Sequence, residues 1–294
     1  MLLKALTVLA LLAVVSANPA LVQRTVQDVN HRALHFNLRF VDGEICRYNL
    51  HYNNDASDAV NVPLENLLPG DTFASIMISN VDSPYLPADH WTNVSVARIK
   101  AFIKVIAPHR IGENAEISTF GTEAADFSSF VESVVEYLHD VRKFEIVSLT
   151  YFGPQTEAFL LYQLGGGVVK RLFMHGNWPN PSTYAVTRFL KNLNSPTASL
   201  GTPDSIQIDK ALFDLVFDKY ITGKLLKFKS VRGHFTFDIA YLNTVRPDLL
   251  SIKHLPADNS KPEREAYIWT VPNSYNTYFT VEVSVEGEEL LIMV

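Results

Sequence analysis

The feature that most constrains this fold is a short unit, a strand, a glycine and a helix, that recurs between about residues 115 and 235. Apolar runs end at Phe120-Gly121, Phe152-Gly153, His175-Gly176 and Arg232-Gly233. The glycines are 32, 23 and 57 residues apart, and the last interval fits two units with a strand at Ser205 to Ile208 between them. Units this short cannot bury their own apolar face, so neighbouring units must stack.

The repeat therefore predicts an α/β fold of the irregular β-α solenoid type. A doubly wound α/β domain with a parallel sheet is the alternative, because a glycine after each strand fits both. Apolar residues three or four apart predict helices at 99–106, 127–138, 159–164, 182–193 and 209–220, the last two capped by Ser182 and Asp209. Strands are expected at 115–120, 144–152, 168–175, 205–208 and 225–231.

The N-terminal part predicts a helix at about residues 20–33 and then a β-hairpin, because apolar residues alternate on both sides of Asp42-Gly43. A three-residue loop, 41–43, would pair Leu38 with Cys46 and place Gly43 in a left-handed conformation. This register buries Cys46 as a structural thiol. It is the only cysteine, so no intramolecular disulfide framework is possible.

The C-terminal part alternates in the pattern of strands near 266–271, 279–285 and 290–294, which predicts a small antiparallel sheet at the end of the repeats. We expect four segments along the chain. They are 1–17, a signal peptide; 18–110, an α+β region; 111–260, the β-α repeats; and 261–294, the antiparallel strands.

The first residues have the features of a secretory leader. Lys4 precedes an uncharged stretch, Ala5 to Val15, and small residues at Val15-Ser16-Ala17 fit a cleavage site after Ala17. The mature protein is then expected outside the cell, without a membrane span, and Asn93-Val94-Ser95 becomes a site for N-glycosylation. The net charge of −6 argues against nucleic acid or an anionic lipid surface as the partner.

Two stretches of the repeat region resemble one protein family. Val169 to Pro179 is a strand that ends in a Gly-Asn-Trp-Pro turn, and Ser205 to Phe235 contains Thr222-Gly223-Lys224-Leu225 and Val231-Arg232-Gly233-His234-Phe235. Both are similar to the leucine-rich-repeat-like part of nematode F-box-associated proteins. The resemblance implies a non-catalytic protein-interaction scaffold. The F-box of that family has no counterpart here, because a signal peptide occupies its position, so only the recognition scaffold carries over.

The chain lacks the common catalytic and metal-binding motifs. It has no Gly-x-Ser-x-Gly, His-Glu-x-x-His or Cys-x-x-Cys sequence, and Gly165-Gly166-Gly167 follows a helix, as in a C-terminal cap, and lacks the P-loop spacing. We expect no cofactor and no metal. The candidate binding residues stand near the glycines that follow strands, and they are His175, Asn177, Trp178, Arg232 and His234.

The leading hypothesis is a secreted, non-enzymatic scaffold that binds a protein or peptide on its strand face or on the loops around Gly153, Gly176 and Gly233. The first alternative is a secreted hydrolase with dispersed catalytic residues, which predicts a His–carboxylate pair in a deep pocket. The second is an intracellular F-box-type adaptor, which predicts an uncleaved leader and no glycan at Asn93.

Overall fold

The computed structural model describes residues 32–52, 61–81, 90–179, 183–193, 199–203, 206–222, 231–257, 263–270, 278–284 and 290–293. The expected leader, the capping residue Ser182 and most of the strand expected at 225–231 lie outside this set. Of the helix expected at 20–33 it includes only Arg32 and Ala33, and Ala33 begins a strand.

The larger of two sheets has eight strands in the order β4-β2-β1-β3-β5-β6-β7-β8. From β1 onward each neighbour pairs in parallel, whereas β2 and β4 are antiparallel at one edge. From β1 to the β8 edge the strands stand in chain order, as β1, β3, β5, β6, β7 and β8, while β2 and β4 lie on the other side of β1. The strand bounds are Ala33–Phe40 (β1), Ile45–His51 (β2), Thr72–Ser79 (β3), Thr92–Ser95 (β4), Ile111–Phe120 (β5), Phe144–Thr150 (β6), Arg171–His175 (β7) and Ser199–Gly201 (β8).

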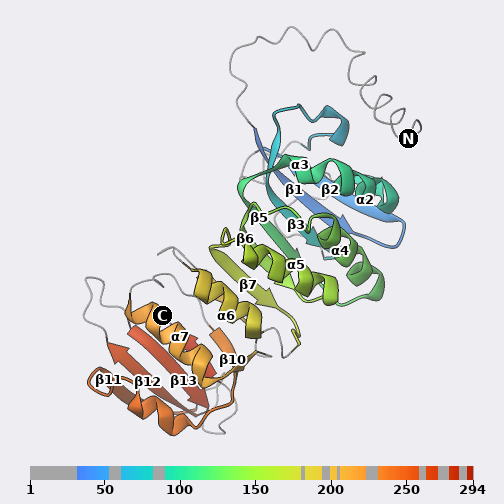
Figure 1. The fold of residues 1–294 in the computed structure, drawn as a ribbon. Coiled ribbons are helices and arrows are strands. Elements are labelled where there is room, and N and C mark those ends of the chain that lie inside the picture. Colours follow the sequence, from blue (N-terminus) through green and yellow to red (C-terminus); the bar gives the residue numbers. More distant parts are fainter. Residues whose placement is uncertain are drawn as a thin grey trace.

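The helices that connect these strands lie in one layer on one face of the sheet, where α2 contacts α3 and α4, α4 contacts α5, and α5 contacts α6 (Figure 1). The helix bounds are Val96–Val105 (α2), Ala107–Arg110 (α3), Ala125–Tyr137 (α4), Pro154–Gly165 (α5) and Thr183–Asn192 (α6), and a 3-10 turn, η3, covers Leu64–Asn66. The fold is thus a mixed α/β structure with a large, mostly parallel sheet, as the sequence predicts at this coarse level.

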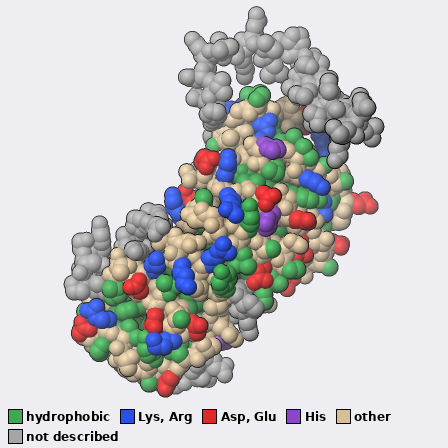
Figure 2. Space-filling view, in the orientation of Figure 1, with side chains coloured by type: hydrophobic (Ala, Val, Ile, Leu, Met, Phe, Trp, Pro, Cys, Tyr) green, Lys and Arg blue, Asp and Glu red, His purple; other side chains and the backbone are tan. Residues whose placement is uncertain are grey.

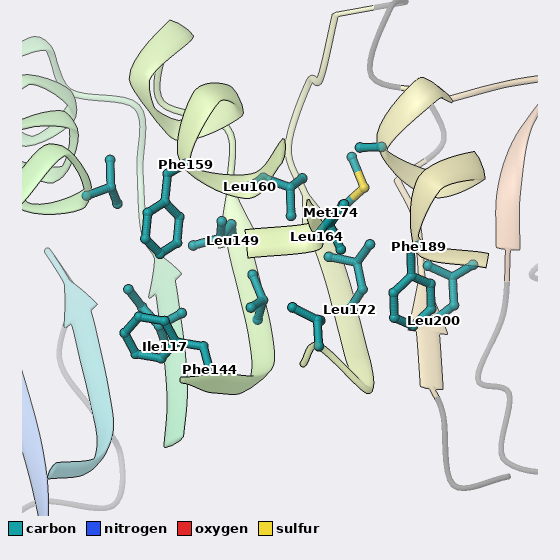
Figure 3. Close-up of a cluster of buried hydrophobic side chains, with 14 of the residues drawn as sticks. Ile117, Phe144, Leu149, Phe159, Leu160, Leu164, Leu172, Met174, Phe189 and Leu200 are labelled. Carbon is teal, nitrogen blue, oxygen red and sulfur yellow. The ribbon is translucent and has the colours of Figure 1, made fainter. Parts of the chain in front are cut away.

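The core lies between the sheet and this helix layer. Alternate strand residues point toward the helices, as Figure 3 shows for Ile117 of β5, Leu149 of β6 and Leu172 of β7, which meet Phe159 and Leu164 of α5. All five side chains are buried. At about 25 cal/mol per Å² of buried apolar surface, this shared layer is the main stabilising contribution to the fold.

The smaller sheet has the order β11-β12-β13-β14-β10-β9, and α7 packs on it (Figure 1). Phe213 and Phe217 of α7 make edge-on or tilted ring contacts with Trp269 and Phe279. The expected C-terminal antiparallel strands are therefore present. The bounds are Gln207–Ile208 (β9), Lys210–Ile221 (α7), Val231–Phe235 (β10), Ile239–Thr244 (η6), Leu250–Leu255 (β11), Arg264–Thr270 (β12), Tyr278–Ser284 (β13) and Leu290–Met293 (β14).

The helix starts and stops follow local chemistry that the sequence shows. Asp209 caps α7 as predicted, because its carboxylate accepts a hydrogen bond from the backbone N–H of Leu212 at 2.7 Å. The glycines after α5 end that helix, with Gly167 in the left-handed region at φ 68°.

The hairpin has the predicted faces but a different register. Phe40 pairs with Cys46 and Leu38 with Tyr48, a shift of two residues from the expected pairing. The cause is Asp42, whose side chain accepts hydrogen bonds from the N–H groups of Glu44 and Ile45 and so makes 42–44 the loop. Gly43 is not left-handed, contrary to expectation. A shift of two keeps Cys46 buried, as predicted.

Two further features differ from the sequence pattern. Gly233 lies inside β10 and does not end the strand. A Cβ at this position would clash with the carbonyl oxygen of Ile206, so the glycine allows the two backbones to lie close together. The sheets also cross the expected divisions at residues 110 and 260. β3 pairs with β5 in the larger sheet, and β11 pairs with β12 in the smaller one.

Candidate interaction face

The face of the eight-stranded sheet opposite the helix layer is the candidate functional site. We call it the helix-free face, because the helices in the described ranges pack on the other side of the sheet. Its side chains alternate with the core residues along each strand. The strand registers align them in two rows. One row contains His51, His35, Ser75, Glu116, Ile146 and Arg171, and the next contains Asn49, Asn37, Met77, Ser118, Ser148 and Phe173.

Polar side chains at the β1–β2 end of these rows form a connected group. Asn49 is fully buried and donates from Nδ2 to the carbonyl oxygen of His90 at 2.8 Å. Its Oδ1 is therefore the acceptor in the 2.6 Å contact with Nδ1 of His51, so Nδ1 of His51 carries a proton. The His51 ring stacks on His35 at 5.3 Å, and Nδ1 of His35 lies 2.8 Å from the Ser75 hydroxyl.

Burial changes the acid–base properties of this group. The pKa of His51 is lowered, first because burial disfavours the charged ring and then because His35 and His90 are near. The pKa of Glu116 is raised by burial, and the charges of His35 and Arg171 oppose that shift. The sheet thus holds a half-buried carboxylate in the same row as His35 and Arg171.

His175, the predicted binding residue of most interest, projects from this face at the end of β7. Its side chain is exposed, and its Nε2 lies 3.1 Å from the Ser148 hydroxyl. The ring is nevertheless partly desolvated where it meets the strand end, and this desolvation lowers the pKa of His175, with no carboxylate contributing. Asn177 is exposed just beyond it. The structure therefore brings His175 and Asn177 together at the strand end.

Trp178, by contrast, is only 2 % exposed. Its indole N–H donates to the carbonyl oxygen of His175 at 2.8 Å, and its ring packs against Tyr151. Trp178 thus holds the strand-end turn in place and offers little surface to a partner.

Arg232 and His234 lie on β10 in the smaller sheet, whereas His175 lies on β7 in the larger sheet. Both side chains are exposed. Two hydrogen bonds between Thr202 and the backbone of Arg232 link β10 to the segment after β8. The predicted binding residues are thus divided between the two sheets.

Asn93, the predicted glycosylation residue, is exposed on the edge strand β4. Its side-chain oxygen accepts a hydrogen bond from Nε of Arg47 at 3.1 Å. Its pairing with Arg47 puts Asn93 on the helix-free face, at the β4 edge of the sheet.

Sequence reasoning missed His35, Asn49, His51, Ser75 and Glu116. Their alternation with apolar core residues marks them as pointing away from the helix layer. Their meeting depends on strand order, which periodicity does not give. Cys46 behaves as predicted: burial raises the pKa of its thiol to about 12, so it is an unreactive core residue.

Within the described ranges, no group of three or more His, Cys, Asp or Glu side chains is placed to hold a metal ion. None of the helices in those ranges is long and apolar enough to cross a membrane. Comparisons of the chain with protein-family models, with curated proteins and with solved structures found no significant match.

Proposed function

We propose that this chain is a secreted, non-enzymatic scaffold that binds a protein or peptide on its helix-free face. The observation that carries the proposal is the one-sided placement of the helices. The connecting helices all lie on one side, and mostly polar side chains, together with Met77, Ile146 and Phe173, line the other in register. This arrangement accords with an irregular leucine-rich-repeat-like β-α solenoid similar to the F-box-associated family, and repeat scaffolds bind partners across such strand faces.

A hydrolase is the second candidate, because two Ser–His contacts lie on the same face. Ser75 contacts His35, and Ser148 contacts His175. Neither geometry is that of a catalytic triad. Ser75 stands between His35 and Glu116 in the row, and no carboxylate shifts the pKa of His175. Labelling of Ser75 or Ser148 by a fluorophosphonate would favour the hydrolase over the scaffold.

Two matched variants test the binding face. Ser118→Arg places a large side chain in the middle of the helix-free face, whereas Ser129→Arg makes the same change on the exposed surface of α4. Tagged protein is used to capture partners from the extracellular fluid of the source organism. We expect Ser118→Arg to abolish capture of any partner that Ser129→Arg retains. Equal capture by both variants would contradict the proposed face.

Secretion needs a separate test, because the adaptor hypothesis differs from the scaffold hypothesis in location. The full chain is expressed in a secreting animal cell, and intact mass is measured in medium and lysate. We expect protein in the medium that begins at Asn18 and carries a glycan removable by N-glycosidase. Protein retained in the cell with Met1 to Ala17 intact and no glycan would favour the F-box-type adaptor.

A further inference from the structure

The edge of the larger sheet where the parallel strands begin carries a band of cations, which we call the basic edge. It contains the ends of the helices and the starts of the strands that follow them. Figure 2 shows blue side chains gathered on this side of the helix layer, with red ones more frequent on the opposite side. The residues are Lys104, Arg110, Arg142, Lys143, Lys170 and Lys191.

Three of these six cations make ion pairs or hydrogen bonds within the fold. Lys143 pairs with Glu113 at 3.1 Å and Lys170 with Glu145 at 3.0 Å. Arg110 donates to the backbone carbonyl oxygens of Leu68 and Asp71. Cations at helix ends also complement the helix dipole. These contacts explain why single cations occur here.

Three exposed cations remain. Lys104 and Lys191 lie in the last turns of α2 and α6, and Arg142 follows α4. Lys104 lies over the ring of Tyr137 and Arg142 over that of Tyr162. Within the described part of the chain, none of the three contacts a carboxylate. Asp140, in the same turn as Arg142, is an exposed carboxylate of this edge, so the edge keeps an excess of positive charge on a chain of net charge −6.

We propose that the basic edge binds an acidic polypeptide segment, and that this segment belongs to the partner of the helix-free face. The inference thus rests on the proposed function. Arg171 connects the two surfaces, because it lies in the first row of the helix-free face and directly follows Lys170. A partner lying along that row reaches the basic edge at β7.

A short acidic segment fits better than nucleic acid or a membrane. Charges farther apart than about 8–10 Å are screened at physiological salt, so the attraction on a short bound segment comes mainly from the cations next to it. A long polyanion or an extended anionic surface would also meet the acidic remainder of the molecule.

The test uses a fluorescein-labelled twelve-residue peptide rich in Glu and Ser, with a matched peptide in which Gln replaces Glu. The variant Arg142→Glu/Lys191→Glu reverses two charges at the basic edge. The control Arg98→Glu/Lys253→Glu reverses two exposed charges elsewhere and leaves the net charge the same as in the edge variant. Binding is measured by fluorescence anisotropy at low and at physiological salt.

We expect the Glu peptide to bind, the Gln peptide not to bind, and salt to weaken binding. The edge variant should lose affinity about tenfold or more and the control no more than about twofold, because only local charge contributes strongly. Equal losses in both variants, binding of the Gln peptide, or no binding of the Glu peptide would overturn the inference. So would tighter binding to heparin or to phosphatidylserine vesicles than to the peptide. If Ser118→Arg abolishes partner capture while the edge variant does not weaken it, this inference fails and the proposed function stands.

Discussion

At the scale of single residues, the helix-free face depends on one buried polar contact. Asn49 fixes the tautomer of His51 through a 2.6 Å hydrogen bond, and His51 in turn stacks on His35. Burial of the His51 imidazole disfavours its charged form, so the stability of the fold depends on pH. The sign follows from the lowered pKa of His51. Below its ordinary value of 6.5 the unfolded chain takes up a proton that the folded chain resists.

We therefore expect the folded state to lose stability as pH falls through about 6.5, with the loss complete below the folded-state pKa of His51. His175 contributes in the same direction. His51→Gln should flatten this dependence, measured as urea midpoints between about pH 7.5 and about pH 5. His254→Gln, at an exposed histidine paired with Glu263, is the control. A His51→Gln slope as steep as that of the unsubstituted protein would contradict this account.

A second residue-scale prediction concerns Gly153, where β6 passes into α5. Its φ is 155°, and a Cβ there would stand 2.1 Å from Oε1 of Glu132. The same carboxylate oxygen accepts a hydrogen bond from the N–H of Gln155 in the first turn of α5. Gly153→Ala should cost roughly 2–3 kcal/mol of unfolding free energy, because it combines backbone strain with displacement of this cap.

Gly43→Ala is the matched control for that substitution. Nothing lies within 4 Å of a Cβ at Gly43, and its φ is outside the left-handed region, so we expect a change within about 0.5 kcal/mol. Denaturant unfolding measures both variants. Similar stabilities for the two would show that Gly153 is not constrained as described.

At the scale of elements, α7 is held at its start by Asp209. Asp209→Ala should destabilise the protein by about 1 kcal/mol, whereas Asp209→Asn, which keeps an acceptor, should cost only a few tenths. Thermal unfolding followed by circular dichroism compares them. If Asn is as costly as Ala, then the acceptor atom is not what stabilises the helix start.

The elements also show how far sequence reasoning reaches. The helices near Phe127 and Leu212 were predictable because their apolar residues recur at helical spacing and bury one face. The hairpin register was not, because it depends on the side-chain turn at Asp42. The short edge strands β4 and β8 have too few residues for a periodic pattern. The contact of His51 with His35 required the strand pairing itself.

At the scale of the whole molecule, the larger sheet has one face covered by helices and one face lined mostly by polar side chains. The covered face provides stability through the shared core, so that core does not depend on the side chains of the opposite face. Hydrogen bonds between Thr202, which follows β8 of the larger sheet, and Arg232 of β10 connect the smaller sheet to the larger one.

The most direct test of the central claim is histidine footprinting with diethylpyrocarbonate on the chain with and without its captured partner. His175 lies on the helix-free face, and His254 lies on β11 in the smaller sheet; both are exposed. The account predicts that the bound partner slows modification of His175 and leaves that of His254 unchanged. Slowed modification of His254 with His175 unchanged would place the partner elsewhere and contradict the account.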